Sequence, residues 1–147
     1  MKQVLFLCTG NYYRSRFAEH LFNWFATQKG LNWNADSKGL ALERGVNNVG
    51  AISPYAKEAI AERGINTVTP QERYPQSLME KDFQGANMVI ALDESEHLPL
   101  MQERFPNHAD SIIYWLVHDI DKTKPEVALK EIEKKVFGLI EDLVINI

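Results

Sequence analysis

Two runs of consecutive apolar residues predict strands buried inside a sheet. The first covers Val4 to Leu7 and ends at the turn Thr9-Gly10-Asn11, and the second covers Met88 to Leu92. Continuous apolar runs of this length, bounded by turn residues, are typical of strands with both faces covered. Two further strands are predicted, a weaker one at 32–37 and one at 111–117, where β-branched and aromatic residues collect.

Apolar residues at helical spacing predict helices between and after these strands. In the first helix they recur from Phe17 to Phe25, Ser15 is expected to cap the start, and Lys29-Gly30 is expected to end it. Residues 38–52 and 65–76 are expected to be loops. Three further helices are predicted: one from Ser53-Pro54 to Gly64, a short one that begins with a capping box at Ser77–Glu80, and one from Ser95 to Phe105. A long final helix is predicted to begin near Thr123, Pro125 and Glu126, with a buried stripe formed by Leu129, Ile132, Val136, Leu139 and Leu143.

Strands that alternate with helices predict an α/β fold. The crossover helices of βαβ units pack on the faces of a parallel sheet, so the pattern predicts a doubly wound, four-stranded parallel sheet with helices on both faces. In such sheets ligands bind at the carboxyl ends of the strands, beside the first loop when the strand order reverses there. Cys8 lies in that loop.

Size and charge narrow the class of protein. The 147 residues, 45% of them hydrophobic, fit a single domain over residues 1–147 with a core of its own. The net charge of -4 comes from interspersed charges, so we expect no nucleic-acid partner. No apolar run approaches the ~20 residues of a membrane span, and Val4 to Leu7 is too short for a secretory signal. The single cysteine cannot form an internal disulfide, so we expect a cytoplasmic location.

The loop after the first strand carries the chemistry. Cys8 is followed by five residues, then by Arg14 and Ser15. A loop of this length between a strand and a helix can curl its backbone N–H groups inward and form an anion site at the positive helix end. Arg14 can then grip two phosphate oxygens with its planar guanidinium. Gly10 is expected to supply a backbone angle closed to other residues, and Asn11 to brace the loop in a left-handed conformation.

The same groups act on Cys8. Inward N–H groups, a helix N-terminus and Arg14 favour the thiolate over the thiol, and a thiolate under a bound phosphate can attack in line. A covalent phosphate on sulfur is the expected intermediate, and neither a metal ion nor a cofactor is expected. Ser15 could donate a hydrogen bond to the sulfur in addition to capping the helix, and the alternative is a helix cap alone. The alternative for Cys8, an inert buried residue, is disfavoured by the surrounding strand, Gly-Asn pair and helix.

On these residues the chain resembles the low-molecular-weight protein tyrosine phosphatase family, whose phosphate loop is Cys-x-Gly-Asn-x-Cys-Arg-Ser. The stretch 86–95 is similar to the family's apolar strand and the Met-Asp segment after it, and Val117-His118-Asp119 resembles the approach to its Asp-Pro loop. The resemblance implies flavodoxin-like strand order in a phosphatase I-like fold. It also implies Asp119 as general acid, with Asp121 as the alternative. We expect Asp93 to be structural and His118 to be an ordinary loop histidine.

The sequence departs from the family pattern at several positions. Tyr13 stands where the family usually has a second cysteine, which removes the usual disulfide protection of the nucleophile. Arg16 and Ile120 each replace a proline, and the aromatic pair that usually follows the acid is absent. No histidine lies between His20 and His97 to brace the loop asparagine and serine. Strict preference for phosphotyrosine is therefore not implied.

The resemblance also implies the substrate-binding residues and the partners. Aromatic side chains usually line the mouth of such sites, and Tyr12 and Tyr13 are candidates, although either could instead pack in the core or on the surface. Expected partners are a phosphorylated protein or a small phosphomonoester, with phosphate as product and inhibitor. The expected catalytic residues are Cys8, Arg14 and Asp119, and the expected substrate-binding residues are Thr9, Gly10, Asn11, Tyr12, Tyr13, Arg14 and Ser15.

The sequence therefore predicts a phosphomonoester hydrolase, in particular a protein-tyrosine phosphatase with a cysteinyl-phosphate intermediate. One alternative is an enzyme like the thiol-dependent arsenate reductases, which share this fold and loop. With one cysteine this chain would need external thiols for that reaction. Another alternative is a catalytically silent module that binds phosphate for recognition. Turnover of an aryl phosphate distinguishes the hydrolase from the silent module.

Overall fold

Four parallel strands form one sheet in the computed structural model, which describes residues 1–67 and 72–146. The strand order β2-β1-β3-β4 places β1 inside the sheet, and the direction of strand addition reverses beside it. The predicted α/β class with flavodoxin-like order is therefore confirmed. The strands are β1 (Lys2–Cys8), β2 (Trp33–Gly39), β3 (Met88–Ala91) and β4 (Ile113–Tyr114).

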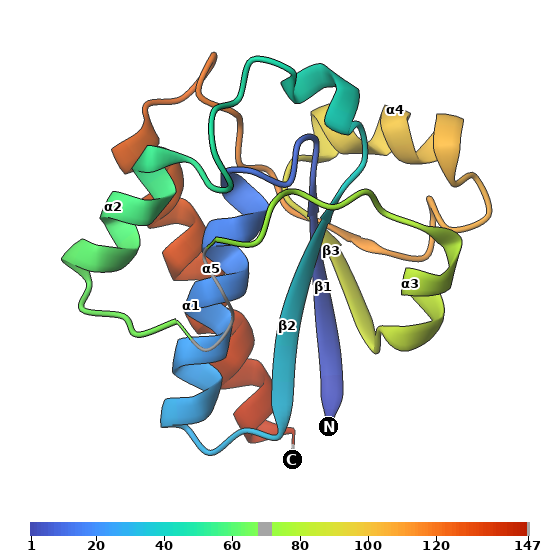
Figure 1. Cartoon of the computed structure of the whole chain (residues 1–147). Helices are drawn as coiled ribbons and strands as arrows, with labels where there is room; N and C mark the ends of the chain where they lie inside the picture. The colour runs from blue at the N-terminus through green and yellow to red at the C-terminus, as the bar shows by residue number, and fades with distance from the viewer. Residues whose placement is uncertain (68–71, 147) are drawn as a thin grey trace.

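Helices cover both faces of the sheet, as Figure 1 shows. One face is covered by α1, α2 and α5, and the other by α3 and α4. Within the described residues, no helix combines the length and apolar character needed to cross a membrane. The helices are α1 (Arg14–Gln28), α2 (Pro54–Glu62), α3 (Glu80–Gly85), α4 (Glu94–Arg104) and α5 (Pro125–Ile145), and a 3-10 turn η1 spans Leu42–Gly45.

The side chains of β1 alternate between two cores. Val4 and Phe6 are buried with the residues of α1, α2 and α5, whereas Leu5 and Leu7 are buried against α4 and the segment around it. Because both sets are apolar, β1 has the continuous hydrophobic run that a strand covered on both faces requires. The strand predicted from this run is confirmed, and its carboxyl end carries Cys8 into the interior.

Three expected helix starts differ in detail. Tyr13 is the N-cap residue of α1 and makes no side-chain cap, so Ser15 lies inside the helix and its predicted role as a cap was wrong. Met79 is the N-cap residue of α3, and its backbone N–H donates to Asp82 Oδ2 over 2.8 Å, so the reciprocal capping pair starts two residues after Ser77. The helix α5 starts after Lys124, without a side-chain cap.

One of the two segments expected to be loops contains regular secondary structure. Residues 38–52 contain the end of β2 and the turn η1, and of the loop expected at 65–76 the residues 68–71 lie outside the described part of the chain. The segment predicted as a strand at 111–117 keeps only β4 as regular strand, although Trp115 and Val117 donate backbone hydrogen bonds to the end of β3. Because the strands are parallel, these bonds place the segment after Val117 at the carboxyl end of the sheet, where Cys8 ends β1.

Candidate active site

The β1–α1 loop is held from behind by the side chain of Asn11. This residue is fully buried and has a left-handed backbone with φ 50. Its Nδ2 donates to the hydroxyl oxygens of Ser15 and Ser37, each over 2.9 Å, and its Oδ1 accepts from the backbone N–H of Gln76 over 3.0 Å. Side-chain hydrogen bonds of this kind allow asparagine to hold the left-handed conformation. The predicted brace is confirmed.

The left-handed conformation does not fall on Gly10, contrary to expectation. Among the described residues positive φ occurs at Asn11 and at three glycines that do not include Gly10. A Cβ on Gly10 would lie 3.4 Å from Asn48 Nδ2, which is an ordinary van der Waals contact. A Cβ on Gly39 would lie only 3.0 Å from the carbonyl oxygen of Thr9. Close packing against the loop therefore requires glycine at Gly39, at the end of β2.

Cys8 and Ser15 lie in hydrogen-bond contact. Cys8 Sγ is 2.9 Å from Ser15 Oγ, and the thiol is free and almost completely buried. Because Ser15 Oγ accepts the N–H of Asn11, its own proton is available to point at the sulfur. Of the two roles considered for Ser15, the geometry selects the donor to Cys8.

Arg14 lies beside Cys8 with its side chain only 2% exposed. Its NH1 donates to the carbonyl oxygen of Val117 over 3.0 Å and lies 3.6 Å from Asp93 Oδ2. Its NH2 donates to Glu96 Oε2 over 3.1 Å and lies 3.5 Å from Asp119 Oδ2. Segments after β1, β3 and β4 thus meet at one guanidinium.

The surroundings keep Arg14 charged despite its burial. Burial works to lower the pKa of Arg14, but the opposing charges of Cys8, Asp119 and Glu96 outweigh it and raise this pKa above its ordinary value. Arg14 is therefore a permanent positive charge at the floor of the site.

Asp93 has the structural role expected for it. It is the N-cap of α4, where its Oδ1 accepts from the backbone N–H and the hydroxyl of Ser95. Its Oδ2 lies 2.9 Å from His118 Nδ1. Burial works to raise the pKa of Asp93, but these hydrogen bonds and the nearby charges of His118 and Arg14 lower it. The ionised carboxylate therefore positions both Arg14 and the segment that carries Asp119.

A cavity of about 420 Å³ opens above Cys8. From the predicted loop it is lined by Cys8, Gly10, Tyr12, Tyr13 and Arg14, whereas Thr9, Asn11 and Ser15 lie outside the lining and support it. The other lining residues come from 47–49, 53–55 and 119–120. The prediction that Tyr12 and Tyr13 border the site is thus matched by their positions. Tyr55 and the asparagines of the 46–50 loop were not anticipated.

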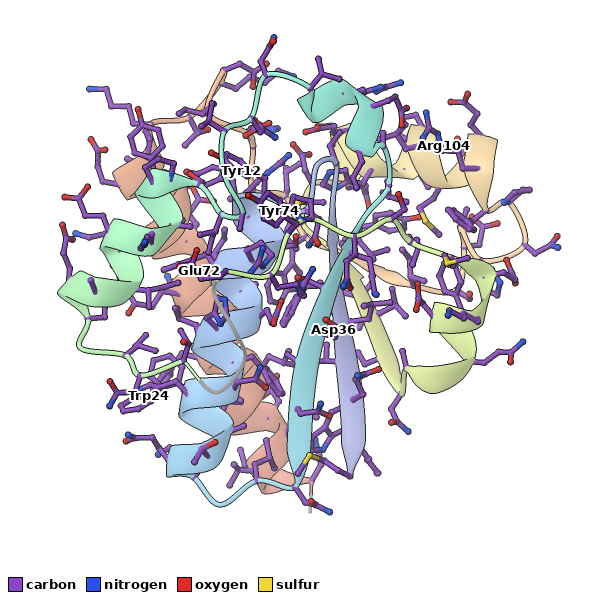
Figure 2. The ribbon with its side chains drawn as sticks, in the orientation of Figure 1. Tyr12, Trp24, Asp36, Glu72, Tyr74 and Arg104 are labelled. Carbon is purple, nitrogen blue, oxygen red and sulfur yellow. The ribbon has the colours of Figure 1, made fainter. Side chains whose placement is uncertain are left out.

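The two loop tyrosines contribute differently to the wall of the cavity. The hydroxyl of Tyr12 donates to the carbonyl oxygen of Val49 over 2.6 Å, and Figure 2 shows Tyr12 beside the loop that connects β2 to α2. Tyr13 is buried, with its ring 6.5 Å from that of Tyr55 in an edge-to-face arrangement. Burial and, after it, the charge of Asp119 raise the pKa of Tyr13 to about 12, so its hydroxyl stays protonated.

Asp119 lines the cavity of Cys8, whereas Asp121 does not. The side chain of Asp119 is 40% exposed, and its Oδ1 accepts from the backbone N–H of Ile120 over 2.8 Å. Asp121 is exposed and lines a neighbouring hollow, which it shares with Asp119, Ser95 and Glu96. The carboxylate that shares a cavity with Cys8 and Arg14 is therefore that of Asp119.

Arg73 occupies the place of the missing bracing histidine. Its NH1 donates to Asn11 Oδ1 over 3.1 Å, and its NH2 donates to Ser37 Oγ over 3.0 Å and to Glu19 Oε1 over 3.2 Å. Asp36 Oδ1 lies 3.8 Å from the same NH2 group. The guanidinium thus ties the catalytic loop to β2 and α1. Sequence reasoning showed that a brace was missing but did not identify its replacement.

Arg73→Met is expected to lower the free energy of unfolding by about 1–3 kcal/mol, because it removes several hydrogen bonds from partly buried acceptors. Urea unfolding measures the effect. Arg44→Met is the matched control, since Arg44 is exposed and forms none of the contacts described for Arg73, and its variant should unfold like the wild type. Equal midpoints for the two variants would show that Arg73 does not hold the loop.

Comparison with known proteins identifies relatives over the whole fold. The family model for low molecular weight phosphotyrosine protein phosphatases matches residues 3–144. A protein-arginine-phosphatase of Bacillus subtilis is 31% identical over 109 residues, which are 74% of this chain and 67% of that protein. A low molecular weight phosphotyrosine protein phosphatase of Sus scrofa is 32% identical over 97 residues, 64% of this chain and 56% of that protein.

The structural comparison agrees with the sequence comparison. The crystal structure of a low molecular weight protein tyrosine phosphatase from T. tengcongensis superimposes with a TM-score of 0.74 and is 29% identical, with 100% of both chains covered. Sequence and fold thus identify the same group of proteins over nearly the full length of the chain. The chain belongs to the low molecular weight phosphotyrosine protein phosphatase family.

Proposed function

We propose that the protein hydrolyses phosphomonoesters, in particular phosphotyrosine in proteins, through a phosphate ester of Cys8. The observation that carries this proposal is that Cys8, Arg14 and Asp119 line one cavity, with Ser15 Oγ 2.9 Å from the nucleophilic sulfur. The site thereby combines a nucleophile, a fixed cation for the phosphoryl oxygens and a carboxyl group at the mouth. Membership of the family supports the same reaction.

The first step forms the phosphoenzyme. The Cys8 thiolate attacks phosphorus and the ester bond breaks, while backbone N–H groups of the loop and Arg14 stabilise the charge on the equatorial oxygens. The departing oxygen takes the proton of the Asp119 carboxyl group, so that a neutral alcohol or phenol leaves. Thr9 to Ser15 would surround the phosphoryl group during this step as a phosphate-binding loop.

The second step releases phosphate. The Asp119 carboxylate accepts a proton from a water molecule, whose oxygen attacks phosphorus as the sulfur–phosphorus bond breaks. The electron pair returns to Cys8 as a thiolate, and the hydroxyl of Ser15 can stabilise that charge by donating a hydrogen bond. Phosphate then leaves and acts as a product inhibitor. Because this nucleophile must stay reduced, we propose that the protein works in the cytoplasm.

Asp119→Asn is expected to slow the phosphorylation step with phosphotyrosine by about 10²-fold and to affect an activated aryl phosphate much less, because an acidic phenol leaves without a proton. Single-turnover rates over a series of aryl phosphates measure this dependence on the leaving group. Asp121→Asn is the matched control and should behave like the wild type. A steep leaving-group dependence in Asp121→Asn, with little change in Asp119→Asn, would reverse the assignment.

Phosphoarginine is a second candidate substrate. Asp119 is a half-exposed carboxylate at the mouth of the cavity and could accept hydrogen bonds from a guanidinium, and the aromatic pair that usually follows the acid in the family is absent. The Bacillus relative is described as a protein-arginine-phosphatase. Turnover of phosphoarginine and phosphotyrosine peptides of equal sequence distinguishes the two substrates. Turnover of neither, with retained phosphate binding, would indicate the silent module or the thiol-dependent arsenate reductase.

A further inference from the structure

The carboxylate of Glu96 is already bound to Arg14, the cation proposed to bind phosphate. Glu96 Oε2 lies 3.1 Å from Arg14 NH2, the shortest contact between Arg14 and any of its three carboxylate neighbours in the described structure. Arg14 is 2% exposed and Glu96 29% exposed, so this pair is shielded from water on the side of the guanidinium. The same guanidinium must grip the phosphoryl oxygens in the proposed reaction.

A hydrogen-bonded chain holds Glu96 in this position. The backbone N–H of Asp93 donates to His97 Nδ1 over 3.0 Å, so the ring proton of neutral His97 lies on Nε2. This Nε2 is 3.1 Å from Thr9 Oγ1, and the hydroxyl of Thr9 in turn donates to Glu96 Oε1. Each donor in the chain is thereby directed toward Glu96.

His97 keeps this arrangement over the working pH range. It is fully buried, and burial together with the positive charge of Arg14 lowers the pKa of His97 to about 3. The ring therefore remains neutral, and its tautomer is fixed by the backbone donor. Glu96 also lies in the first turn of α4, where the helix dipole favours a negative charge. The carboxylate is thus held by independent contacts and is not a mobile surface charge.

A phosphoryl dianion in the loop would share Arg14 with this carboxylate. Two anions on one guanidinium repel each other, and the repulsion is weakly screened where the cation is buried. We propose that Glu96 is a resident anion that competes with the phosphoryl group for Arg14 and so weakens the binding of substrate and product phosphate. The inference rests on the proposed function, since it concerns the same phosphate-binding loop.

Glu96→Gln is expected to bind inorganic phosphate about tenfold more tightly than the wild type, because it removes the charge but keeps the size of the side chain. Calorimetric titration of the full chain with inorganic phosphate measures this affinity directly. The inhibition constant of phosphate against an aryl phosphate, and the KM of that substrate, should fall in parallel. Urea unfolding of the variant confirms that it is folded.

Glu94→Gln is the matched control. Glu94 lies on the same turn of α4 and is exposed, and its variant also removes one negative charge without touching Arg14. Phosphate affinity in this variant should stay within about twofold of the wild type, as expected for a distant, solvent-screened charge. A tightening as large as that of Glu96→Gln would overturn the proposal, since only the general field of the protein would then matter.

The direction in which phosphate affinity changes in Glu96→Gln distinguishes competition for Arg14 from positioning of Arg14. If Glu96 only held Arg14 in place, Glu96→Gln would leave phosphate affinity unchanged or weaken it, and either result would overturn the inference while wild-type turnover still supported the proposed function. A wild-type protein that neither binds phosphate nor hydrolyses an aryl phosphate would overturn both. Tighter binding in Glu96→Gln alone supports the resident anion.

Discussion

Cys8→Ser is expected to abolish turnover of aryl phosphates and to leave phosphate binding in place. Serine has the same shape, but its hydroxyl stays protonated near neutral pH, and among the described residues no histidine lines the cavity to act as its base. The loss should be at least about 10⁴-fold in kcat, the scale seen when a covalent nucleophile is removed. The loop backbone and Arg14 are unchanged in the variant, so the anion site persists.

Two measurements check this expectation. Steady-state turnover of an aryl phosphate gives the loss in rate, and calorimetric titration with phosphate shows whether the anion site survives. Mass spectrometry of wild-type protein, quenched during turnover, should find one phosphoryl group on the peptide that contains Cys8. Ser37→Ala is a useful control, because it alters the same hydrogen-bond network behind the loop and leaves the sulfur in place. Comparable turnover in Cys8→Ser would exclude the covalent mechanism.

Arg14→Lys is expected to lower kcat/KM by about 10³-fold, because a point charge cannot replace a planar, two-pronged donor during phosphoryl transfer. The variant also loses the directed bonds that Arg14 makes to Val117 and Glu96. A lysine in their place would have one ammonium group for the backbone carbonyl, the carboxylates and the phosphoryl group. Binding of inorganic phosphate should weaken along with turnover.

Arg104→Lys is the matched control for this substitution. Arg104 lies at the C-terminal end of α4, where Figure 2 labels it, and donates to the carbonyl oxygen of Leu40 and to Glu43. It does not line the cavity of Cys8. Its variant should retain wild-type kcat/KM. Unfolding midpoints of both variants separate a loss of fold from a loss of chemistry. An Arg14→Lys protein with near wild-type efficiency would show that the loop does not grip phosphate through this side chain.

The parts of the fold that depend on local pattern could be predicted from the sequence. The apolar runs at 4–7 and 88–92 identified β1 and β3, because a strand covered on both faces needs uninterrupted hydrophobic residues. The Cys8 loop was recognisable for a similar reason, since its residues are adjacent in the chain. The predicted role of Ser15 as a helix cap was wrong, because α1 starts at Arg14 and the Ser15 hydroxyl contacts the sulfur of Cys8.

The parts that depend on distant contacts could not be predicted in the same way. Arg73 lies 62 residues from Asn11, and Glu96 lies 82 residues from Arg14. A single arginine in a loop or a glutamate in the first turn of a helix has no local pattern that distinguishes it from a solvated charge. The one available signal was negative: a loop asparagine with a buried amide needs a partner, and the usual histidine was missing.

The inner position of β1 has a consequence for local unfolding. Every residue of β1 pairs with β2, and Val4 to Leu7 also pair with β3, so any opening that frees Cys8 has to separate the strand from neighbours on both sides. The exposed 46–50 loop, in contrast, is held at the cavity by the hydrogen bond from Tyr12 to Val49 and has no strand pairing among the described residues. Such loops open at low free-energy cost, whereas central strands open only with the whole domain. The mouth of the cavity can therefore change shape around substrates of different size while the sulfur of Cys8 keeps its position relative to Arg14.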